Sequence, residues 1–179
     1  MQQATNTFEV DTTHEDNIND CQFDYYGTMI ASVDSKGFIQ ISSVRNDGQQ
    51  ESQNYFSAHE GPIWQVSWAH PKYESVIATC GYDNYVRVWK RDEKIHELNL
   101  GSSVICIAWA PWEYGLILAA GTADGRLAVI AKNHDDSWEI KADFTAHDSG
   151  VNGISWGPAT EPAILMESPD ASAASGGKF

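Results

Sequence analysis

The sequence has few basic residues, few cysteines and no long apolar run. Its 179 residues include 11 Lys and Arg against 25 Asp and Glu, which gives a formal net charge of −14. Because gripping a phosphate backbone needs clustered Lys and Arg, this balance argues against a DNA- or RNA-binding protein. No run approaches the roughly 18 to 20 apolar residues that a membrane crossing needs, so we expect no direct insertion into a bilayer.

The cysteines and histidines do not form a metal-binding pattern. Cys21, Cys80 and Cys106 are far apart, and no pair forms a CxxC motif. The six histidines supply no short paired spacing of the kind that zinc sites use, so we expect no metal and no cofactor. An odd cysteine count, no Asn-x-Ser/Thr acceptor and no basic-then-apolar leader in residues 1–11 favour an intracellular protein with reduced thiols.

A segment centred on tryptophan recurs along the chain. It occupies residues 63–71, 104–111 and 151–158, and a weaker copy at 18–23 has phenylalanine in the tryptophan position. The four aromatic residues are 45, 41 and 47 positions apart. These spacings fit the period of about 40–45 residues of propeller blades better than the period of about 33–34 of ankyrin or TPR repeats.

Further short apolar runs follow each segment and are separated by turn residues. In the second unit, residues 76–80 and 86–90 flank a turn that contains Asp83, and the third unit repeats the pattern around Asp124. Such runs, rich in β-branched and aromatic residues, predict antiparallel strands joined by hairpins, with little helix. Four strands per unit predict an all-β protein built of propeller blades.

The second unit resembles the WD-repeat family. His59 opens it, Asp83 lies in the turn between its second and third strands, and Trp89 closes it. In that family a histidine, an aspartate, a hydroxyl residue and a tryptophan form a buried hydrogen-bonded network. The resemblance implies that the structural network residues here are His59, Thr79, Asp83 and Trp89, with Asp124 and His147 at matching positions of other units.

The His59–Asp83 pair also has the form of a general-base dyad. Its place at repeat positions favours a structural role instead, since packing elements recur with the repeat. The other units depart from the pattern: the first has Lys36 and Ser42-Ser43 where aspartate and tryptophan-aspartate are expected, and the third lacks the histidine. These losses weaken the expectation of a network in either unit.

A closer resemblance covers roughly residues 14–160. The segment 59–73, HEGPIWQVSWAHPKY, is similar to the second blade of the Sec-thirteen family, and so are WAPWEYG at 109–115 and GVNGISWGPAT at 150–160. The motifs Trp-Ala-His-Pro and Trp-Ala-Pro-x-x-Tyr-Gly are partly shared with the sister nucleoporin Seh-one. The sequence is therefore identified as a Sec-thirteen-type WD-repeat β-propeller, with Seh-one as the alternative.

This resemblance implies a non-enzymatic scaffold. Members of the family are open six-bladed propellers that receive a seventh blade in trans from a partner. The partner is the large COPII coat subunit in ER-to-Golgi transport, or an α-helical nucleoporin of the nuclear pore Y complex. A nutrient-signalling complex also uses the family. The implied location is cytoplasmic, at ER-derived vesicles or the nuclear envelope, within a hetero-oligomeric assembly.

The edge implied for the partner strand is Thr7-Phe8-Glu9-Val10, which alternates apolar and polar residues. A fraying terminus, or a strand that pairs within its own chain, explains the same pattern equally well. Both interpretations stay open at this point.

Four units account for nearly the whole sequence. We expect an N-terminal arm at 1–13, blades at 14–58, 59–99 and 100–146, and a partial fourth blade with an Ala/Ser/Gly-rich tail at 147–179. Ring closure needs about 4–8 blades. The sequence therefore predicts an incomplete propeller, about three and a half blades of an open six-bladed one.

The sequence contains no motif for an enzyme. It has no Gly-x-Ser-x-Gly, no His-Glu-x-x-His and no phosphate-cradling glycine loop. A rival hypothesis is an adaptor that binds an acidic or phosphorylated peptide through Arg87, Lys90, Arg91 and Lys94. A solvated strand edge is the favoured interpretation of this cluster, because charged residues often cover edges.

Overall fold

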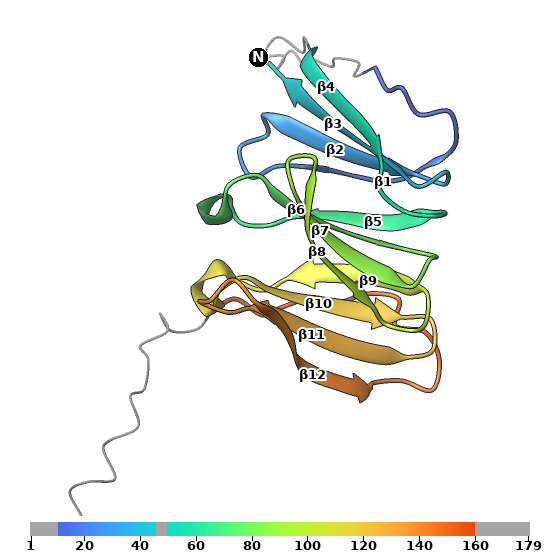
Figure 1. Ribbon diagram of the computed structural model, residues 1–179, viewed down its shortest axis with the longest axis vertical. Helices are drawn as coiled ribbons and strands as arrows, with labels where there is room; N and C mark the ends of the chain where they lie inside the picture. The colour runs from blue at the N-terminus through green and yellow to red at the C-terminus, as the bar shows by residue number, and fades with distance from the viewer. Residues whose placement is uncertain (1–10, 46–49, 160–179) are drawn as a thin grey trace, which may run out of the picture.

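The computed structural model describes residues 11–45 and 50–159, and these ranges contain twelve β-strands and two short 3-10 helices (Figure 1). In chain order the elements are β1 (Ile18–Phe23), β2 (Met29–Asp34), β3 (Phe38–Val44), β4 (Gln50–Ser57), β5 (Ile63–Trp68), η1 (Pro71–Tyr73), β6 (Val76–Gly81), β7 (Tyr85–Lys90), β8 (Glu93–Asn99), β9 (Val104–Trp109), η2 (Trp112–Tyr114), β10 (Ile117–Thr122), β11 (Arg126–Lys132) and β12 (Trp138–Thr145).

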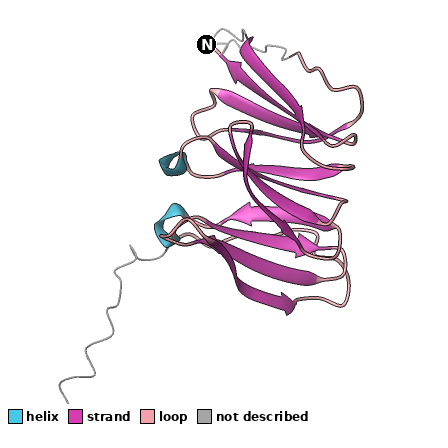
Figure 2. Ribbon diagram, viewed as in Figure 1, coloured by secondary structure: helices cyan, strands magenta, loops and turns pink. Residues whose placement is uncertain are grey.

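The strands form three four-stranded sheets, each with its strands in sequence order. We call β1–β4 the first sheet, β5–β8 the middle sheet and β9–β12 the third sheet. Neighbouring strands within each sheet are antiparallel. The sheets stack face to face, with the middle sheet between the other two (Figures 1 and 2). The prediction of an all-β fold with little helix is confirmed.

Strand β6 shows why the middle sheet lies inside the stack. All six of its residues are buried, as expected for a strand covered on both faces. Ile77 packs into the cluster shared with the first sheet, whereas Ala78 and Cys80 pack into the cluster shared with the third sheet. Because side chains alternate along a strand, one strand contributes to two cores.

Two apolar cores hold the stack together. The core between the first and middle sheets includes Val33, Ile39, Ile63 and Ile77 and the ring of Trp89. The core between the middle and third sheets is larger and consists mainly of aliphatic residues. The innermost strands β1, β5 and β9 contact one another in turn. Sheets that pack through their first strands in this way form the blades of a propeller.

The turns at one end of the sheets share one backbone geometry. Gly37 and Gly125 have φ values of +90° and +88°, and a Cβ at either position would lie 2.2 or 2.1 Å from a backbone carbonyl oxygen, of His59 or His147 respectively. Glycine is therefore required at both positions. In the middle sheet Asn84 takes the same left-handed conformation, with φ of +71°. Asparagine tolerates it better than most residues.

The segment after β12 runs back along the inner strand of the third sheet. The N–H of Val151 donates to the carbonyl of Thr122, and the thiol of Cys106 donates to the carbonyl of Val151 at 3.1 Å. No strand is assigned in the described part of this segment, 146–159. The candidate partner-strand edge at Thr7, Phe8, Glu9 and Val10 lies outside the described residues, as does most of the expected tail.

Candidate functional site: a buried polar network and the faces of the sheets

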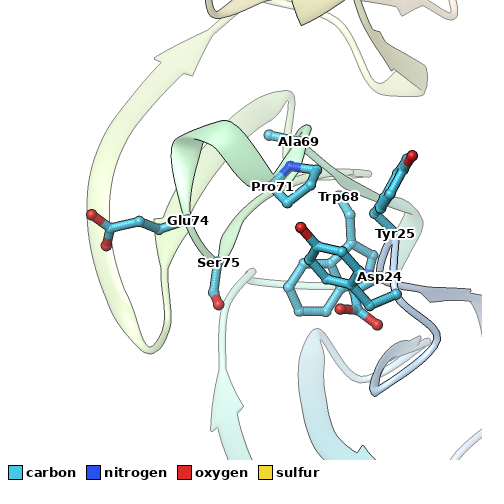
Figure 3. A pocket seen from close by; sticks show the side chains of 8 residues that line it. Asp24, Tyr25, Trp68, Ala69, Pro71, Glu74 and Ser75 are labelled. Carbon is cyan, nitrogen blue, oxygen red and sulfur yellow. The ribbon is translucent and has the colours of Figure 1, made fainter.

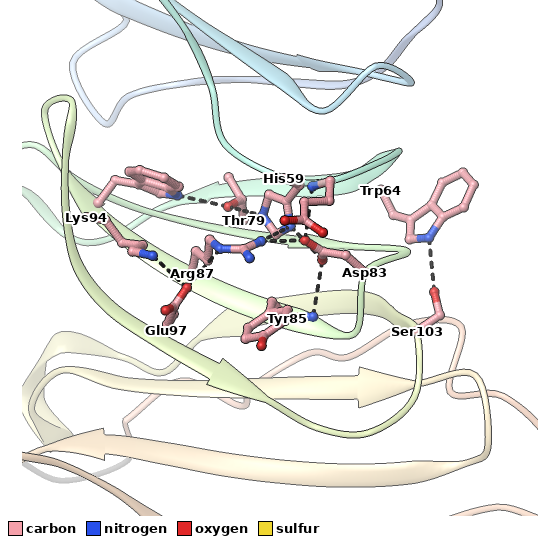
Figure 4. Close-up of polar contacts among 11 residues, drawn as sticks. His59, Trp64, Thr79, Asp83, Tyr85, Arg87, Lys94, Glu97 and Ser103 are labelled. Carbon is pink, nitrogen blue, oxygen red and sulfur yellow. Dashed lines mark hydrogen bonds and ion pairs between the residues drawn. The ribbon is translucent and has the colours of Figure 1, made fainter.

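A chain of hydrogen bonds crosses the buried part of the middle sheet (Figure 4). His59, just before β5, is 4% exposed. Its Nδ1 lies 2.8 Å from Oδ1 of Asp83, and its Nε2 lies 2.8 Å from Oγ1 of Thr79. The indole N–H of Trp89 donates to the same threonine oxygen at 3.0 Å. The Thr79 hydroxyl therefore donates to Nε2, and the Nδ1–H of His59 donates to Asp83.

Arg87 completes this network. Its Nη1 donates to Oδ2 of Asp83 at 2.6 Å and lies 2.7 Å from Nδ1 of His59, and its Nε donates to Glu97 at 3.2 Å. The guanidinium also lies 4.4 Å from the centre of the Tyr85 ring. Although cationic, Arg87 is only 8% exposed. Charged groups are buried at tolerable cost only when partners surround them, and here two carboxylates and an aromatic face do so.

The protonation states of the pair follow from these contacts. Burial favours a neutral carboxyl at Asp83, but the hydrogen bonds from His59 and Arg87 outweigh it and hold the pKa of Asp83 well below its ordinary 3.8. Burial lowers the pKa of His59 below its ordinary 6.5, and Asp83 opposes that shift. Near neutral pH the network thus consists of an uncharged imidazole, a carboxylate and a guanidinium.

This geometry does not allow His59 to act as a general base. Both ring nitrogens already have protein partners, and the ring is buried. A general base must lie within hydrogen-bond reach of a substrate proton. The contacts instead join the loop before β5, strand β6, the β6–β7 turn and strand β7.

The first sheet has a network of its own, on the face that points away from the middle sheet. His14 lies 2.7 Å from Oδ2 of Asp34 and 2.8 Å from Oγ of Ser32. Oδ1 of Asp34 accepts from the backbone N–H groups of Lys36 and Phe38. The expectation that Lys36 leaves this unit without its carboxylate is wrong. Asp34, two positions earlier at the end of β2, supplies it.

Two further polar side chains extend this face of the first sheet. Gln40 is 1% exposed; its amide donates to Oγ of Ser42 at 3.0 Å and its Oε1 accepts from the N–H of Thr13 at 2.7 Å. Ser42 occupies the tryptophan position of this unit. The face therefore presents polar groups, satisfied by the segment that precedes β1.

The third sheet does not bring its two expected residues together. Asp124 is exposed and accepts a hydrogen bond from the hydroxyl of Thr122. His147 is exposed too, and within the described residues no hydrogen bond joins it to Asp124. Leu100 stands where the other units have a histidine, and it is buried. The unit thus keeps the turn aspartate but has no buried polar network around it.

The repeated tryptophans have a role that the sequence pattern did not identify. The indole N–H of Trp68 donates to the carbonyl of Gln22 at 2.9 Å, and that of Trp109 donates to the carbonyl of Ser67 at 3.0 Å. Trp156 repeats the contact with Ala108 at 2.9 Å. Each indole therefore ties one unit to the inner strand of the unit before it. The regular spacing of these tryptophans, 41 and 47 residues, is the sequence feature from which this role could have been inferred.

Side chains of the inner strands add parallel contacts. Asp20 and Gln22 of β1 accept from the backbone N–H groups of Val66 and Trp68, and Gln65 accepts from that of Ile107. These bonds satisfy N–H groups on the free edges of β5 and β9. A polar residue in an inner strand thus marks a contact between sheets.

The basic cluster of the middle sheet is largely neutralised. Arg87 is buried in the network, Lys94 pairs with Glu97 at 2.7 Å, and Lys90 pairs with Glu74 at 3.0 Å. Arg91 lies in the turn after β7 with φ of +61°. The arrangement is that of a charged strand edge rather than of a binding surface for an acidic peptide.

Within residues 11–45 and 50–159, no group of three or more His, Cys, Asp or Glu side chains has an arrangement that would hold a metal ion. None of the helices there has the length and apolar character that a membrane crossing requires.

The chain is 41% identical over 161 residues to a Drosophila melanogaster protein named Protein SEC13 homolog. It is 38% identical over 174 residues to Protein transport protein SEC13 of Cryptococcus neoformans var. neoformans serotype D and 32% identical over 196 residues to that of Mycosarcoma maydis. Over most of its own length the chain is therefore similar to Sec13 proteins. These alignments include 86%, 88% and 93% of the chain but 45%, 52% and 54% of the relatives, so it spans about half their length.

Two further comparisons concern the fold. The family model described as WD domain, G-beta repeat matches residues 50–90, which include His59, Thr79, Asp83, Arg87 and Trp89 of the middle sheet. A chain in a solved structure titled Crystal Structure of Mitotic Checkpoint Complex superposes with a TM-score of 0.64 at 18% identity, and the alignment covers 78% of this chain and 44% of that one. At this identity the likeness concerns the fold alone.

Proposed function

We propose that this chain is a non-enzymatic structural scaffold of a protein-transport assembly. In this proposal it pairs with a subunit that inserts a blade in trans, in COPII vesicle coats for ER-to-Golgi transport, in the nuclear pore Y complex, or in both. The partner is the large coat subunit or an α-helical nucleoporin. The location is then cytoplasmic, at ER-derived vesicles or the nuclear envelope, and membrane association runs through the partner.

The blade boundaries belong to the same proposal. Residues 14–58, 59–99 and 100–146 are three blades, and 147–179 contributes to a fourth. The hydrogen bonds of His59, Thr79, Asp83 and Trp89 are proposed to hold the middle blade together, whereas Asp124 shapes a turn.

The observation that carries the proposal is that the two ends of the stack have different chemistry. The outer face of the third sheet is apolar, with Leu127 and Val129 half-buried and Phe144 52% exposed. The outer face of the first sheet carries the polar groups Ser32, Gln40 and Ser42, which the segment before β1 buries. An apolar face suits a further blade of the same propeller. The free edge of β1, which ends in the 46% exposed Phe23, suits a strand from another protein.

Affinity purification of the tagged chain from cells tests this function. We expect a coat subunit or an α-helical nucleoporin among the main recovered proteins, and the more abundant of the two identifies the principal assembly. Phe23→Asp should reduce that recovery, because Phe23 is 46% exposed at the end of β1. Phe144→Asp, on the opposite end of the stack, is the matched control and should leave recovery unchanged.

Solution behaviour provides a second test. Purified alone, the 179-residue chain should aggregate through its uncovered sheet faces. Co-expression with the large coat subunit should yield a soluble complex. A monodisperse chain that melts cooperatively by itself would contradict the proposed need for a partner blade.

A further inference from the structure

Three aromatic rings form a row across the loops at one end of the stack. Tyr25 comes from the β1–β2 loop, His70 precedes η1, and Trp112 begins η2. The ring centres of Tyr25 and His70 are 5.6 Å apart, and those of His70 and Trp112 are 5.4 Å apart. The two short helices that carry the row lie on the same side of the stack (Figure 2). The row therefore crosses all three sheets.

The rings are held in place yet remain accessible. Tyr25 is 73% exposed, its neighbour Tyr26 is 69% exposed, and Trp112 is 40% exposed. The hydroxyl of Tyr73 in η1 donates to the carbonyl of Trp112 at 3.1 Å, which joins the two helices. Large exposed aromatic patches on rigid elements mark interaction sites more often than isolated exposed rings do.

Asp24 fixes the other end of the row. Its Oδ1 accepts from the backbone N–H groups of Thr28 and Met29 at 2.7 and 2.8 Å. Four residues of the loop, among them Tyr25 and Tyr26, are thereby closed into a compact turn. The aromatic side chains are presented by hydrogen-bonded backbone, so little order has to be gained when something binds.

A small cavity of about 150 Å³ opens beside this turn (Figure 3), comparable to a few waters at about 30 Å³ each. Its walls include Tyr25, Tyr26, Trp68 and Pro71. The cavity has the size and apolar character to accept one small ring. Aromatic-lined grooves of this kind receive the proline rings of extended peptides.

The charges around the row favour a basic partner. Asp24 lines the cavity and forms no ion pair with a cation in the described ranges, whereas Glu74 is paired with Lys90. The ammonium of Lys72 lies over the Trp112 ring, 4.6 Å from its centre, so a partner's basic side chain is expected at the Asp24 end of the row and not on this ring face. The whole chain has a net charge of −14, which adds long-range attraction for a basic segment.

We propose that this row binds an extended, proline-rich segment of a partner protein that carries Arg or Lys beside its prolines. The two centroid distances place the outer rings at most about 11 Å apart, and a polyproline II helix advances about 9 Å per turn. Prolines three positions apart therefore match the row, and the basic side chain faces Asp24. This proposal does not rest on the proposed function.

Titration with synthetic peptides tests the site, on the full chain attached at low density to a biosensor surface so that its molecules cannot aggregate. The probe is a twelve-residue peptide with two prolines three positions apart and an arginine on each side, and the biosensor signal reports binding. Tyr25→Ala and Trp112→Ala should each weaken binding about tenfold or more, as expected for exposed aromatic anchors. Tyr25→Phe should bind like the unchanged chain, because it keeps the ring. Tyr82→Ala, a 64% exposed tyrosine at the opposite end of the sheets, is the matched control and should bind normally.

Matched peptides separate the contributions of shape and charge. Replacing both prolines with alanine, or both arginines with glutamate, should each weaken binding about tenfold or more. No binding of the probe, equal binding by all variants, or preference for the acidic peptide would overturn the proposal. Circular dichroism of each variant verifies that the sheets are intact, so a loss of binding with unchanged spectra supports the site. Because the assay contains no coat subunit or nucleoporin, its outcome is independent of the affinity purification.

Discussion

The middle and third sheets have the same architecture but fill equivalent positions with different chemistry. Four residues of the middle sheet stand 41 positions before four residues of the third: His59, Thr79, Arg87 and Trp89 correspond to Leu100, Ala120, Ala128 and Ile130. The first set is linked by hydrogen bonds through Asp83. All four members of the second set are buried in the apolar core.

The two sheets indicate that a blade needs, at these positions, either a complete set of hydrogen-bonded polar residues or a complete set of apolar ones. A buried polar group without a partner costs about 1–3 kcal/mol, whereas replacing all partners with apolar groups of similar shape is close to neutral. The third sheet has lost every buried polar member together and keeps only Asp124, which is exposed. Substitutions that mix the polar and apolar sets within one sheet should therefore lower the free energy of unfolding more than substitutions that exchange one whole set for the other.

The largest expected effect follows from removing the carboxylate of Asp83. In Asp83→Ala the buried guanidinium of Arg87 loses its 2.6 Å partner, and His59 loses the acceptor of its Nδ1–H, which costs about 3 kcal/mol of unfolding free energy. Asp124→Ala removes an exposed carboxylate at the equivalent position and should cost far less. Pulse proteolysis in urea at low protein concentration measures both variants. Equal losses would show that the two sheets do not differ as described.

The next largest change in stability is expected when polar residues of the middle sheet are replaced by their apolar counterparts from the third sheet. His59→Leu alone removes one hydrogen-bond partner from Thr79 and one from Asp83, and should cost about 2 kcal/mol of unfolding free energy. The combined variant His59→Leu/Thr79→Ala/Arg87→Ala/Trp89→Ile recreates the third-sheet set. It should lose at least about 1 kcal/mol less than the sum of its single variants, because neighbouring substitutions couple. Strict additivity in the same proteolysis assay is the contrary result.

A smaller effect is expected from the indole contacts between sheets. Trp109→Phe keeps a ring but removes the N–H that donates to Ser67, and should cost about 1 kcal/mol. The reverse change, Phe23→Trp, adds an indole N–H where no preceding sheet lies among the described residues, and should leave stability unchanged. Urea midpoints of the two variants, measured side by side, provide the comparison. A gain from Phe23→Trp as large as the loss from Trp109→Phe would count against it.

The smallest effect is a dependence on pH near neutrality. The folded-state pKa of His59 lies below its ordinary 6.5 and that of Asp83 lies below its ordinary 3.8, so the unfolded chain binds these protons more readily. Stability should therefore fall as pH decreases, first below 6.5 through His59 and then below 3.8 through Asp83. Urea midpoints at about pH 7.5 and about pH 5.5 measure the first step.

Two histidine variants test whether the fall in stability below pH 6.5 comes from the middle sheet. His59→Leu should flatten the dependence, because the third sheet, with Leu100, contributes no such step. His96 in β8 also has a pKa lowered by burial, so His96→Gln is the control that removes its separate share. An unchanged slope in His59→Leu would show that the network does not titrate as described.

The sequence predicted the buried strands well and the exposed strands poorly. Strands β6 and β10 are nearly continuous apolar runs because neighbours cover both faces, so their composition alone indicates them. Strand β8, with the sequence EKIHELN, is mostly exposed and has no apolar period. It is a strand because its backbone pairs with β7. That information lies in the partner strand and not in the segment itself.

The same reasoning explains the polar networks. His59, Asp83 and Trp89 could be identified from a family pattern, but Arg87 could not be added to them, because a cation in a strand predicts a solvated surface. Its burial depends on Asp83 and on Glu97, which comes from β8. In the first sheet the carboxylate of Asp34 stands two positions from the expected one, and only the folded turn shows that it still reaches His14.

The indole contacts run in one direction along the stack: each tryptophan donates to the inner strand that precedes it in the sequence. A contact with a distinct donor side and acceptor side is heterologous in the language of protein symmetry. Such an interface repeats by a rotation that either closes into a ring or continues as an open helical polymer, and it cannot relate two copies by a two-fold axis. Any association that reuses these faces therefore adds units head to tail. The stack thus has two different ends, as a filament does.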